Sequence, residues 1–319
     1  MRRNVLLSLT LSVIALTVAS LFVTDAYSAK LATWMAIAAL TATSLRFVSL
    51  IGELNFATSA FYGLGAYGAG TAATIVGLPF PIALLIGGIV AFLASIVFGY
   101  VTLKVKGPYF MLIGFAFSEI MRIIYSRSAW VGGNSGMVGI FPPTYFGSYF
   151  PTFVVLLCSI LVIVLCVVEK SDFGKLFTAI RDNDNVVHSV GINVHIIKVA
   201  CFCIASFAAG TAGALHAFTN NVISPGDFGY MLSTFALAYL KVGGEDSAFG
   251  PIIGTIVLVA LGSFAMGMGA GEQVFYGAAI VIAVLLFPTG IVGLAARIMQ
   301  KVWRRESAGP LDQKSRAIG

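Results

Sequence analysis

The chain has 319 residues, of which 59% are hydrophobic and only 10% charged, and it carries a formal net charge of +6 at pH 7. A soluble globular domain has roughly a quarter of its residues charged, so this composition excludes one and indicates an integral membrane protein. The basic residues lie at the ends of apolar stretches rather than in a stripe interleaved with aromatics, which indicates orientation in a membrane and not nucleic-acid binding.

Apolar stretches long enough to cross a bilayer recur along the whole chain, since a membrane-spanning helix needs about 20 residues. They predict an all-α integral membrane protein with about ten transmembrane helices. The eighth stretch is short, which indicates a broken or tilted element. The candidate spans are 4–23, 29–45, 54–76, 81–103, 109–125, 151–168, 195–218, 230–242, 251–267 and 274–296.

The distribution of basic residues sets the orientation of these spans. With the N-terminus inside, all of the 19 Lys and Arg residues except Lys30, Arg122 and Arg127 fall on the inner side, so both termini are expected in the cytoplasm. The first span follows two arginines and also resembles a signal peptide. Residues 23–26 lack a convincing small-x-small cleavage site, which favours a retained span.

The third span contains Gly63-Leu64-Gly65-Ala66-Tyr67-Gly68, which formally matches the dinucleotide pattern GxGxxG. That pattern binds a dinucleotide only after a strand in a βαβ unit with a downstream acid, and neither accompanies it here. We therefore interpret the glycines as a site of close helix approach or of a bent helix.

Four polar residues of this span are candidates for lining a translocation path. The alternative is that these side chains simply form hydrogen bonds to neighbouring helices. They are Asn55, Ser59, Tyr62 and Tyr67.

Glu119 and Arg122 are ionisable residues within a predicted span, where charge is costly. At i and i+3 they share a helix face and can neutralise each other. They are candidates for the translocation path or its gating, and a purely structural pair near the outer membrane face is the alternative.

A polar segment, residues 169–194, separates two apolar stretches and contains seven acidic or basic residues and His188. Such a segment must lie at a membrane face, and the charge bias places it in the cytoplasm. Its middle, 173–180, has apolar residues at helical spacing and predicts a short amphipathic helix that a soluble partner can bind. An ordinary solvated loop is the alternative.

Two outer loops, 130–148 and 220–229, are rich in turn-forming residues and are candidates to meet an external partner. A further polar loop, 241–247, returns to the cytoplasm. The sequence thus predicts one transmembrane domain, 1–296, with the cytoplasmic loop 169–194, and a basic cytoplasmic tail, 297–319, near anionic lipid headgroups.

Motifs for catalysis, nucleotide binding and metal binding are absent from the sequence. It has no Walker A motif, no GxSxG, no HExxH and no cluster of metal-ligand spacing, and its four cysteines lie in apolar runs. We expect neither an enzyme nor a cofactor on this chain. If the protein pumps a solute, another chain supplies the energy.

The order of several segments resembles the permease subunits of ABC importers of the branched-chain amino acid family, of the LivM type. The resemblance runs from about residue 40 to 293, and together, in this order, the segments are specific. They are GELNFATSAFYGLGAYGAG (52–70), GPYFMLIGFAFSEIMR (107–122), GGNSGMVG (132–139), residues 173–194, ISPGDF (223–228) and VGGEDSAFGPIIG (242–254).

The resemblance implies that residues 173–192 form a coupling loop that docks a cytoplasmic ATPase. It implies a complex in the bacterial inner membrane with a LivH-type permease, two ATPase subunits that bind ATP and Mg, and an extracytoplasmic binding protein facing the outer loops. The implied solute is a branched-chain or related amino acid. The implied coupling residues are Phe173, Gly174, Leu176, Phe177, Ile180, Arg181, Asp182 and Gly191.

This chain departs from the general coupling pattern of ABC permeases, Glu-Ala-Ala-x3-Gly, because Asn185, Val186 and Val187 precede Gly191. The residues at the entry to the third span, 53–56, also differ from the commoner sequence of the family, so urea, amides and aromatic acids stay open as alternative solutes. A self-contained secondary carrier that uses Glu119 is another hypothesis. A membrane enzyme or a scaffold is a third, and no catalytic set supports the enzyme.

Overall fold

A computed structural model describes residues 26–267, 277, 281 and 290–294. The predicted first span, most of the tenth and the tail 297–319 lie outside these residues. The chain packs as two compact units, residues 1–237 and 238–319, and each is described by itself. The prediction of a single domain over 1–296 stays a prediction.

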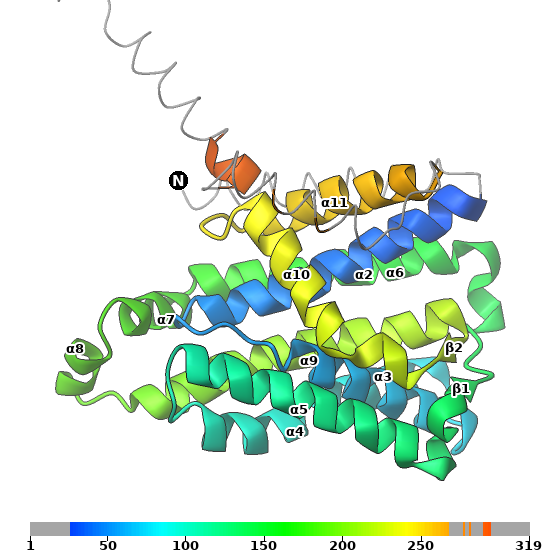
Figure 1. Ribbon diagram of the computed structural model, residues 1–319, viewed down its shortest axis with the longest axis horizontal. Coiled ribbons are helices and arrows are strands. Elements are labelled where there is room, and N and C mark those ends of the chain that lie inside the picture. Colours follow the sequence, from blue (N-terminus) through cyan, green and yellow to red (C-terminus); the bar gives the residue numbers. More distant parts are fainter. Residues whose placement is uncertain (1–25, 268–276, 278–280, 282–289, 295–319) are drawn as a thin grey trace, which may run out of the picture. The chain divides into compact units, whose positions relative to one another are not determined.

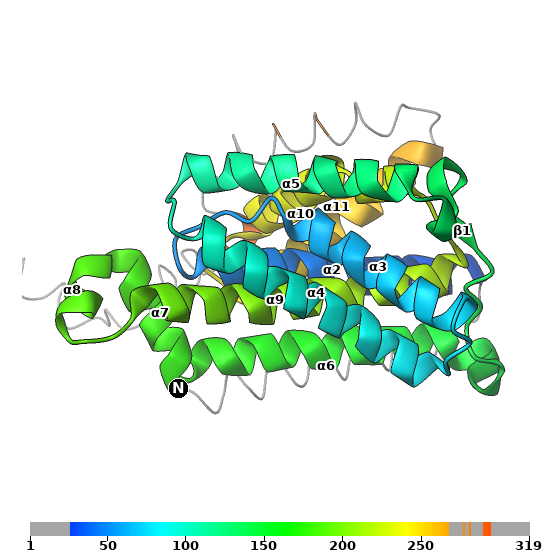
Figure 2. The same ribbon diagram turned by 90° about the horizontal axis from the view of Figure 1, so that it is seen from below.

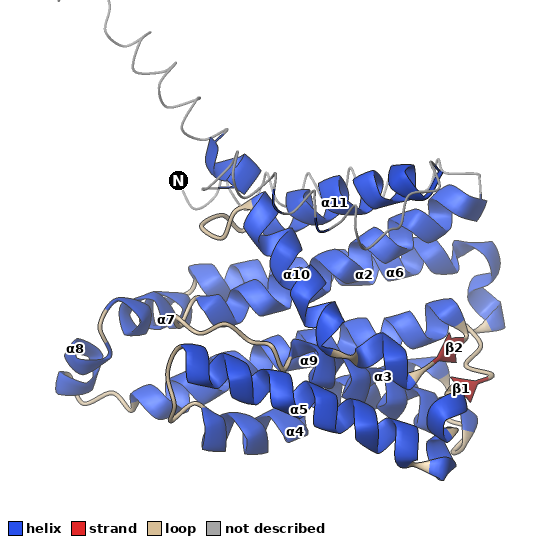
Figure 3. Cartoon of the chain, viewed as in Figure 1, coloured by secondary structure: helices blue, strands red, loops and turns tan. Residues whose placement is uncertain are grey.

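The described part of the first unit is almost entirely helical (Figure 3). Two short strands, β1 (Met137–Val138) and β2 (Val222–Ile223), pair antiparallel, and four 3-10 turns lie in the loops, η1 (Ala129–Val131), η2 (Gly133–Ser135), η3 (Thr144–Tyr149) and η4 (Pro225–Phe228). Helix α10 (Tyr230–Gly243) begins in this unit and continues into the second. The other helices are α2 (Ala26–Ser49), α3 (Thr58–Thr74), α4 (Phe80–Thr102), α5 (Pro108–Arg127), α6 (Phe150–Lys170), α7 (Asp172–Asp182), α8 (Asp184–Ser189) and α9 (Val194–Asn220).

Five described helical segments are long and apolar enough to cross a membrane, judged by length and composition. They confirm five of the predicted spans, while the total of about ten and the position of the termini stay predictions. Helix α3 has only 17 residues, because the first four and the last two residues of the predicted third span are not helical. Helix α10 has 14 residues, as expected for the short eighth span. The five segments are Tyr27–Ser49, Phe80–Thr102, Pro108–Arg127, Thr144–Lys170 and Val194–Asn220.

Helices α3, α4 and α9 pack against one another through glycines. A Cβ atom added to Gly65 of α3 would lie 1.9 Å from the backbone oxygen of Gly210 in α9, and one added to Gly213 would lie 1.9 Å from the backbone oxygen of Tyr62. A Cβ on Gly87 of α4 would lie 2.6 Å from the oxygen of Gly65. The glycine-rich third span is therefore used for close helix approach, as its sequence predicts.

The two ends of the first unit carry different elements. Figures 1 and 2, seen from two directions, place α7 and α8 beyond the ends of α6 and α9, and β1 and β2 at the opposite ends of the long helices. The predicted cytoplasmic segment and the predicted outer loops are thus separated by the length of the spans.

The second unit contains the end of α10 and helix α11 (Gly250–Gly267). These helices also meet at glycine, because a Cβ on Gly254 would lie 1.9 Å from the backbone oxygen of Tyr239. The connection between them is closed by an ion pair of Lys241 with Glu245. The glycines of this unit thus permit close backbone packing between α10 and α11.

Replacing Gly65 by alanine should force α3 away from α9, because the new methyl group would meet backbone that cannot rotate aside. We expect a loss of about 1–3 kcal/mol or more, typical of overpacking. Gly68→Ala is the matched control, since a Cβ there would make ordinary 3.5 Å contacts. Thermal unfolding of the detergent-solubilised variants measures both, and equal stability of the two would contradict the assignment.

Candidate functional site

The docking segment, residues 172–191, consists of α7, α8 and the turn that ends at Gly191. Helix α7 is amphipathic, with Gly174, Phe177 and Ile180 buried along one side and Phe173 61% exposed on another. Gly174 packs so closely that a Cβ there would lie 1.7 Å from the backbone oxygen of Glu169. The predicted amphipathic helix is confirmed, and its turn from α6 depends on this glycine.

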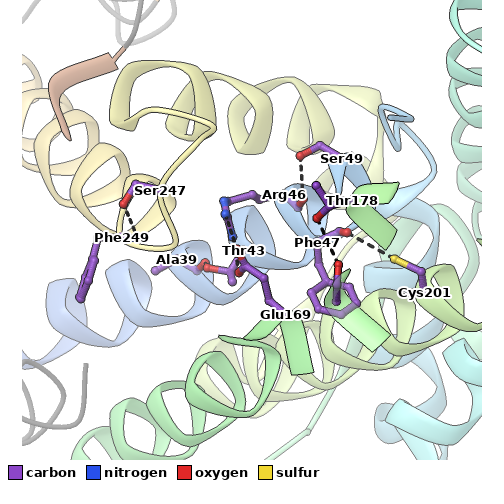
Figure 4. A network of polar contacts seen from close by, with 11 residues as sticks. Ala39, Thr43, Arg46, Phe47, Ser49, Glu169, Thr178, Cys201, Ser247 and Phe249 are labelled. Carbon is purple, nitrogen blue, oxygen red and sulfur yellow. Dashed lines mark hydrogen bonds and ion pairs between the residues drawn. The ribbon is translucent and has the colours of Figure 1, made fainter. Parts of the chain in front are cut away.

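The buried side of α7 rests on the end of α2. The ring of Phe177 packs edge-on against Phe47 with centroids 5.7 Å apart, and Figure 4 shows Phe47 between the two elements. A Cβ on Gly52, which has φ +82°, would lie 3.2 Å from Cγ of Arg181. The apolar residues of α7 therefore hold it to the spans of its own chain.

The predicted coupling residues thus divide into two groups. Gly174, Phe177 and Ile180 are buried in the chain itself, and Leu176 is half-buried. The residues exposed to a partner are Phe173, Arg181, Asp182 and Gly191.

Arg46 at the end of α2 and Glu169 at the end of α6 form a two-pronged ion pair (Figure 4). Nη1 of Arg46 donates to Oε2 of Glu169 at 2.7 Å, and Nη2 donates to Oε1 at 2.8 Å. Arg46 is only 3% exposed, so both charges depend on the partner for compensation. Sequence reasoning placed both residues at the cytoplasmic face but missed the pair, since nothing local signals a contact across 123 residues.

A second charged cluster holds α8. Oδ2 of Asp184 accepts from Nζ of Lys198 in α9 at 3.1 Å and lies 2.5 Å from Nζ of Lys106 in the α4–α5 loop. Oε2 of Glu53, in the non-helical stretch before α3, accepts from the backbone N–H of Gly107 in the same loop at 2.9 Å. Two acids and two lysines thus join α8, α9, the α4–α5 loop and the approach to α3.

The two acids of this cluster are shifted in opposite directions. Burial raises the pKa of Glu53 above its usual value, and the hydrogen bond from Gly107 and the charge of Lys198 offset this only in part. Burial alone would raise the pKa of Asp184 too, but its hydrogen bonds to Lys106 and Lys198 outweigh burial and lower it. Asp184 is therefore firmly ionised at neutral pH and anchors the cluster.

The predicted path residues line the start and the inner side of α3, and all four are buried. Oδ1 of Asn55 accepts from the N–H of Ala57, which stabilises the unwound entry to the helix. The N–H of Ser59 donates to Oγ of Ser233 at 3.0 Å. The carbonyl of Phe56 accepts from the hydroxyls of Ser118 (2.8 Å) and Ser233 (2.9 Å), so the broken backbone is satisfied by neighbouring helices.

Tyr62 and Tyr67 belong to an aromatic cluster between α3, α5, α9 and η4. Tyr67 stacks on Tyr125 of α5 with centroids 4.3 Å apart, and Phe228 of η4 lies 5.5 Å from Tyr67 and 6.0 Å from Tyr62. His216 of α9 lies 5.6 Å from Tyr62. Sequence reasoning did not select Tyr125 or Phe228, whose only signal was an aromatic residue at the edge of a polar loop.

Glu119 and Arg122 form the ion pair that their spacing predicts, with Oε2 of Glu119 2.7 Å from Nε of Arg122. The other carboxylate oxygen, Oε1, accepts from the backbone N–H of Tyr230, the first residue of α10, at 3.2 Å. Both oxygens of Glu119 thus have structural partners. A carboxylate at a helix N-terminus is also favoured by the helix dipole.

The two predicted outer loops are joined by strand pairing. Met137 lies opposite Ile223 and Val138 opposite Val222, and the N–H of Ile140 donates to the carbonyl of Asn221. The structure therefore makes one surface of two loops that are far apart in the sequence. An external partner that binds either loop contacts the pair.

Comparison with known proteins identifies the chain over most of its described length. The family model described as "Branched-chain amino acid transport system / permease component" matches residues 27–288. No solved structure matches the chain significantly.

Three curated relatives are similar to parts of the chain. The high-affinity branched-chain amino acid transport system permease protein LivM of Escherichia coli K12 is 26% identical over 275 residues, which cover 77% of this chain and 65% of the relative. A probable LivM protein of Methanocaldococcus jannaschii is 24% identical over 215 residues, 64% of this chain and 60% of the relative. A probable ABC transporter permease, YphD of E. coli, is 26% identical over 125 residues, 37% of this chain and 38% of the relative.

Asp184→Asn should destabilise the protein at neutral pH by up to about 3 kcal/mol, because it leaves the buried Lys198 without its carboxylate. Glu53→Gln should cost less, since burial of Glu53 already disfavours its charge and the amide oxygen can still accept from Gly107. Thermal unfolding of both variants at pH 7 tests this order. The reverse order would contradict the role of Asp184 as anchor.

The pH dependence has an expected sign for each acid. Because the folded-state pKa of Asp184 is lowered, its stabilisation is present above its ordinary pKa of 3.8 and is lost as the pH falls through the lower folded value. Glu53 has a raised folded-state pKa, so its burial costs stability as the pH rises through its ordinary value of 4.5. On acidification toward pH 4.5 the wild type regains stability that Glu53→Gln cannot gain, so the stability gap between these two proteins should widen. The gap between the wild type and Asp184→Asn should narrow instead, and only below pH 3.8.

Proposed function

The chain belongs to the branched-chain amino acid transport permease family, and on this premise we propose that it is the membrane-spanning permease subunit of an ATP-driven importer in a bacterial inner membrane. Its solute is a branched-chain or related amino acid delivered by an extracytoplasmic binding protein. Its partners are a second, LivH-type permease subunit and two cytoplasmic ATPases that bind ATP and Mg. The chain spans about 65% of the length of the LivM relative from E. coli, so these assignments are proposals for the chain itself.

The docking segment carries this proposal. It offers an exposed surface formed by Phe173 on α7 and by Val186 and Val190 on and after α8, which are 59% and 73% exposed. Apolar side chains exposed on a charged cytoplasmic segment suit burial by a soluble partner. Among the described residues, no group of three or more His, Cys, Asp and Glu side chains is placed to hold a metal ion.

The attachments of the docking segment explain how a partner can move the spans. Phe177 and the pair of Arg46 with Glu169 fix α7 to α2 and α6, and Asp184 fixes α8 to α9 and the α4–α5 loop. Closure of two ATPases would displace α7 and α8 together. These contacts are buried and either tightly packed or charged, so α7 and α8 would carry the spans with them. The movement of the spans would then open the solute path to one membrane face and close it to the other.

The path for the solute runs along α3 in this proposal. Asn55 lies just before its start and Ser59 in its first turn, while Tyr62 lies in its first half and Tyr67 just past its middle. Urea, amides and aromatic acids remain alternative solutes within the same family. The secondary-carrier hypothesis gains no support from Glu119, because both of its oxygens have structural partners.

Phe173→Ala should release the ATPase while leaving the permease stable, because the side chain of Phe173 is 61% exposed and contributes little to packing within its own chain. Phe177→Ala is the matched comparison, since Phe177 is 1% exposed and its loss should destabilise the permease itself by about 3–5 kcal/mol. The measurement is a mild-detergent pull-down from native cells, with thermal stability of each purified permease.

Three outcomes of this pull-down are informative. Recovery of an ATPase with the wild type and its loss with Phe173→Ala supports docking through α7. An ATPase retained by Phe173→Ala would place docking elsewhere on the chain. If the wild-type chain copurifies with no ATPase and, as the only protein in liposomes, still transports leucine, the importer proposal would be overturned.

Glu119→Gln should retain at least half of the wild-type uptake, because glutamine still offers an oxygen to the N–H of Tyr230. A secondary carrier that uses Glu119 as its coupling carboxylate would instead lose uptake completely. Uptake of radiolabelled leucine into reconstituted liposomes, with and without a proton gradient, separates the two. Arg122→Lys, which keeps the positive charge beside Glu119, is the control for its surroundings.

A further inference from the structure

Four buried hydroxyl groups in the first unit have no hydrogen-bond partner among the described residues. One is Oγ of Ser206 in α9, and the other three belong to α3 and α5. They are Oγ of Ser59 and the phenol oxygens of Tyr67 and Tyr125. Their side chains are almost completely buried, at 0%, 4% and 5% exposure. A buried hydroxyl without a hydrogen-bond partner costs free energy of folding. A group of three therefore indicates that a molecule other than this chain supplies the missing hydrogen bonds.

Most other buried hydroxyls of the first unit form hydrogen bonds within the chain. Thr41 and Thr43 of α2 donate to carbonyls four residues earlier, and Ser118 of α5 donates to two carbonyls. Back-bonding of this kind is the usual solution in a membrane helix. Ser59, Tyr67 and Tyr125 therefore depart from the pattern of their neighbours.

The three hydroxyl-bearing residues lie along one boundary, between α3 and α5. Ser59, Gly63 and Tyr67 are spaced four residues apart and share a face of α3. A Cβ on Gly63 would lie 3.0 Å from the ring of Tyr125, and Tyr125 stacks on Tyr67. We call this row the hydroxyl face.

Phe228 closes the outer part of the hydroxyl face. Its side chain is completely buried, and it packs against Gly63, where a Cβ would lie 3.1 Å from Cβ of Phe228. Its ring lies 5.5 Å from Tyr67 and 6.3 Å from Tyr125. It belongs to η4, which comes from an outer loop, so it fills the face from the outside.

Resting on the function proposed above, we propose that the hydroxyl face of Ser59, Tyr67 and Tyr125 binds the amino acid in transit and that Phe228 is the plug at its outer end. Phenol and serine hydroxyls donate to a carboxylate. The aromatic faces of the tyrosines accept an ammonium group or an apolar side chain. A zwitterionic amino acid with an apolar side chain matches both features.

The loop of Phe228 is built to move as a piece. Oδ2 of Asp227 accepts from the N–H of Ser224, which closes η4 on itself, and β2 immediately before it pairs with β1. Displacement of the paired outer loops would therefore withdraw Phe228 from its contacts with Gly63 and with the stacked rings of Tyr67 and Tyr125. The plug and the surface for an external partner are parts of one structure.

Accessibility of a cysteine tests the plug without any solute. Ser59→Cys places a small thiol on the hydroxyl face, one helical turn toward the cytoplasm from Gly63. A charged, membrane-impermeant methanethiosulfonate is applied from outside to spheroplasts that contain the whole complex. We expect little labelling with Phe228 present and labelling about tenfold faster in Phe228→Ala, with Phe228→Leu between them.

Phe218→Ala is the matched control, because Phe218 is equally buried but packs on Phe80 and away from the hydroxyl face. It should leave labelling of Ser59→Cys unchanged although it loses the same volume. The four native cysteines, all buried, give the background in the chain without Ser59→Cys. Equal labelling with Phe228 and Phe228→Leu, in a complex of unchanged elution volume, would overturn the plug.

Removal of the two phenol oxygens tests the binding role. In the reconstituted complex, the double variant Tyr67→Phe with Tyr125→Phe should move about tenfold less leucine per ATP hydrolysed, which corresponds to one lost hydrogen bond to a charged group. Tyr109→Phe, at an exposed tyrosine, is the control. An unchanged ratio would mean that the hydroxyls hold only buried water and would overturn this part.

The failure of this inference is distinct from the failure of the proposed function. A wild-type complex that imports no leucine speaks against the proposed solute. The labelling of Ser59→Cys uses no solute and no ATP, so it decides the role of Phe228 in either case.

Discussion

The close approach of the α3 and α9 backbones at Gly65, Gly210 and Gly213 is the constraint on which the rest of the first unit depends. Without a hydrophobic driving force between helices in lipid, such contacts rely on van der Waals packing at short range. They fix a short α3 whose first residues are unwound. That irregular backbone is possible only because Ser118 and Ser233 satisfy the carbonyl of Phe56.

The end of the unit that carries α7 and α8 combines packing with charge. Phe177 and the pair of Arg46 with Glu169 tie α7 to two spans, whereas the cluster around Asp184 ties α8 to two others. A buried ion pair is a poor source of net stability but a strict determinant of geometry, since either partner alone is costly. The docking segment is thus positioned more firmly than its sequence of exposed polar residues suggests.

The sequence was sufficient for features that depend on local pattern. Five long spans, the amphipathic α7 and the shortness of α10 follow from periodicity and composition, because each depends on residues within a few positions of one another. The glycines of α3 were predicted to allow close helix approach, but their partners in α9 were not identified. The pairing of Arg46 with Glu169 and of β1 with β2 could not be predicted in this way. Those contacts join residues far apart in the chain, and charge or strand propensity alone names no partner.

The candidate site shows the same division. Ser59 and Tyr67 were found because polar residues in an apolar helix are conspicuous, whereas Tyr125 and Phe228 resemble ordinary aromatic residues at helix and loop ends. Burial also changed the meaning of the coupling residues. Phe177 and Ile180 have the pattern of a docking face but are 1% exposed, so only the structure separates what holds α7 from what a partner can touch.

Helix α6 gives these observations a mechanical consequence. Its 21 residues, roughly 31 Å of helix, begin just after the loop that carries β1 and end at Glu169 and Lys170, next to α7. A single stiff rod therefore joins the outer strand pair to the docking segment. In the proposed complex, if the ATPase and the external partner both favour one position of this rod, each would change the affinity for the other by the same coupling free energy.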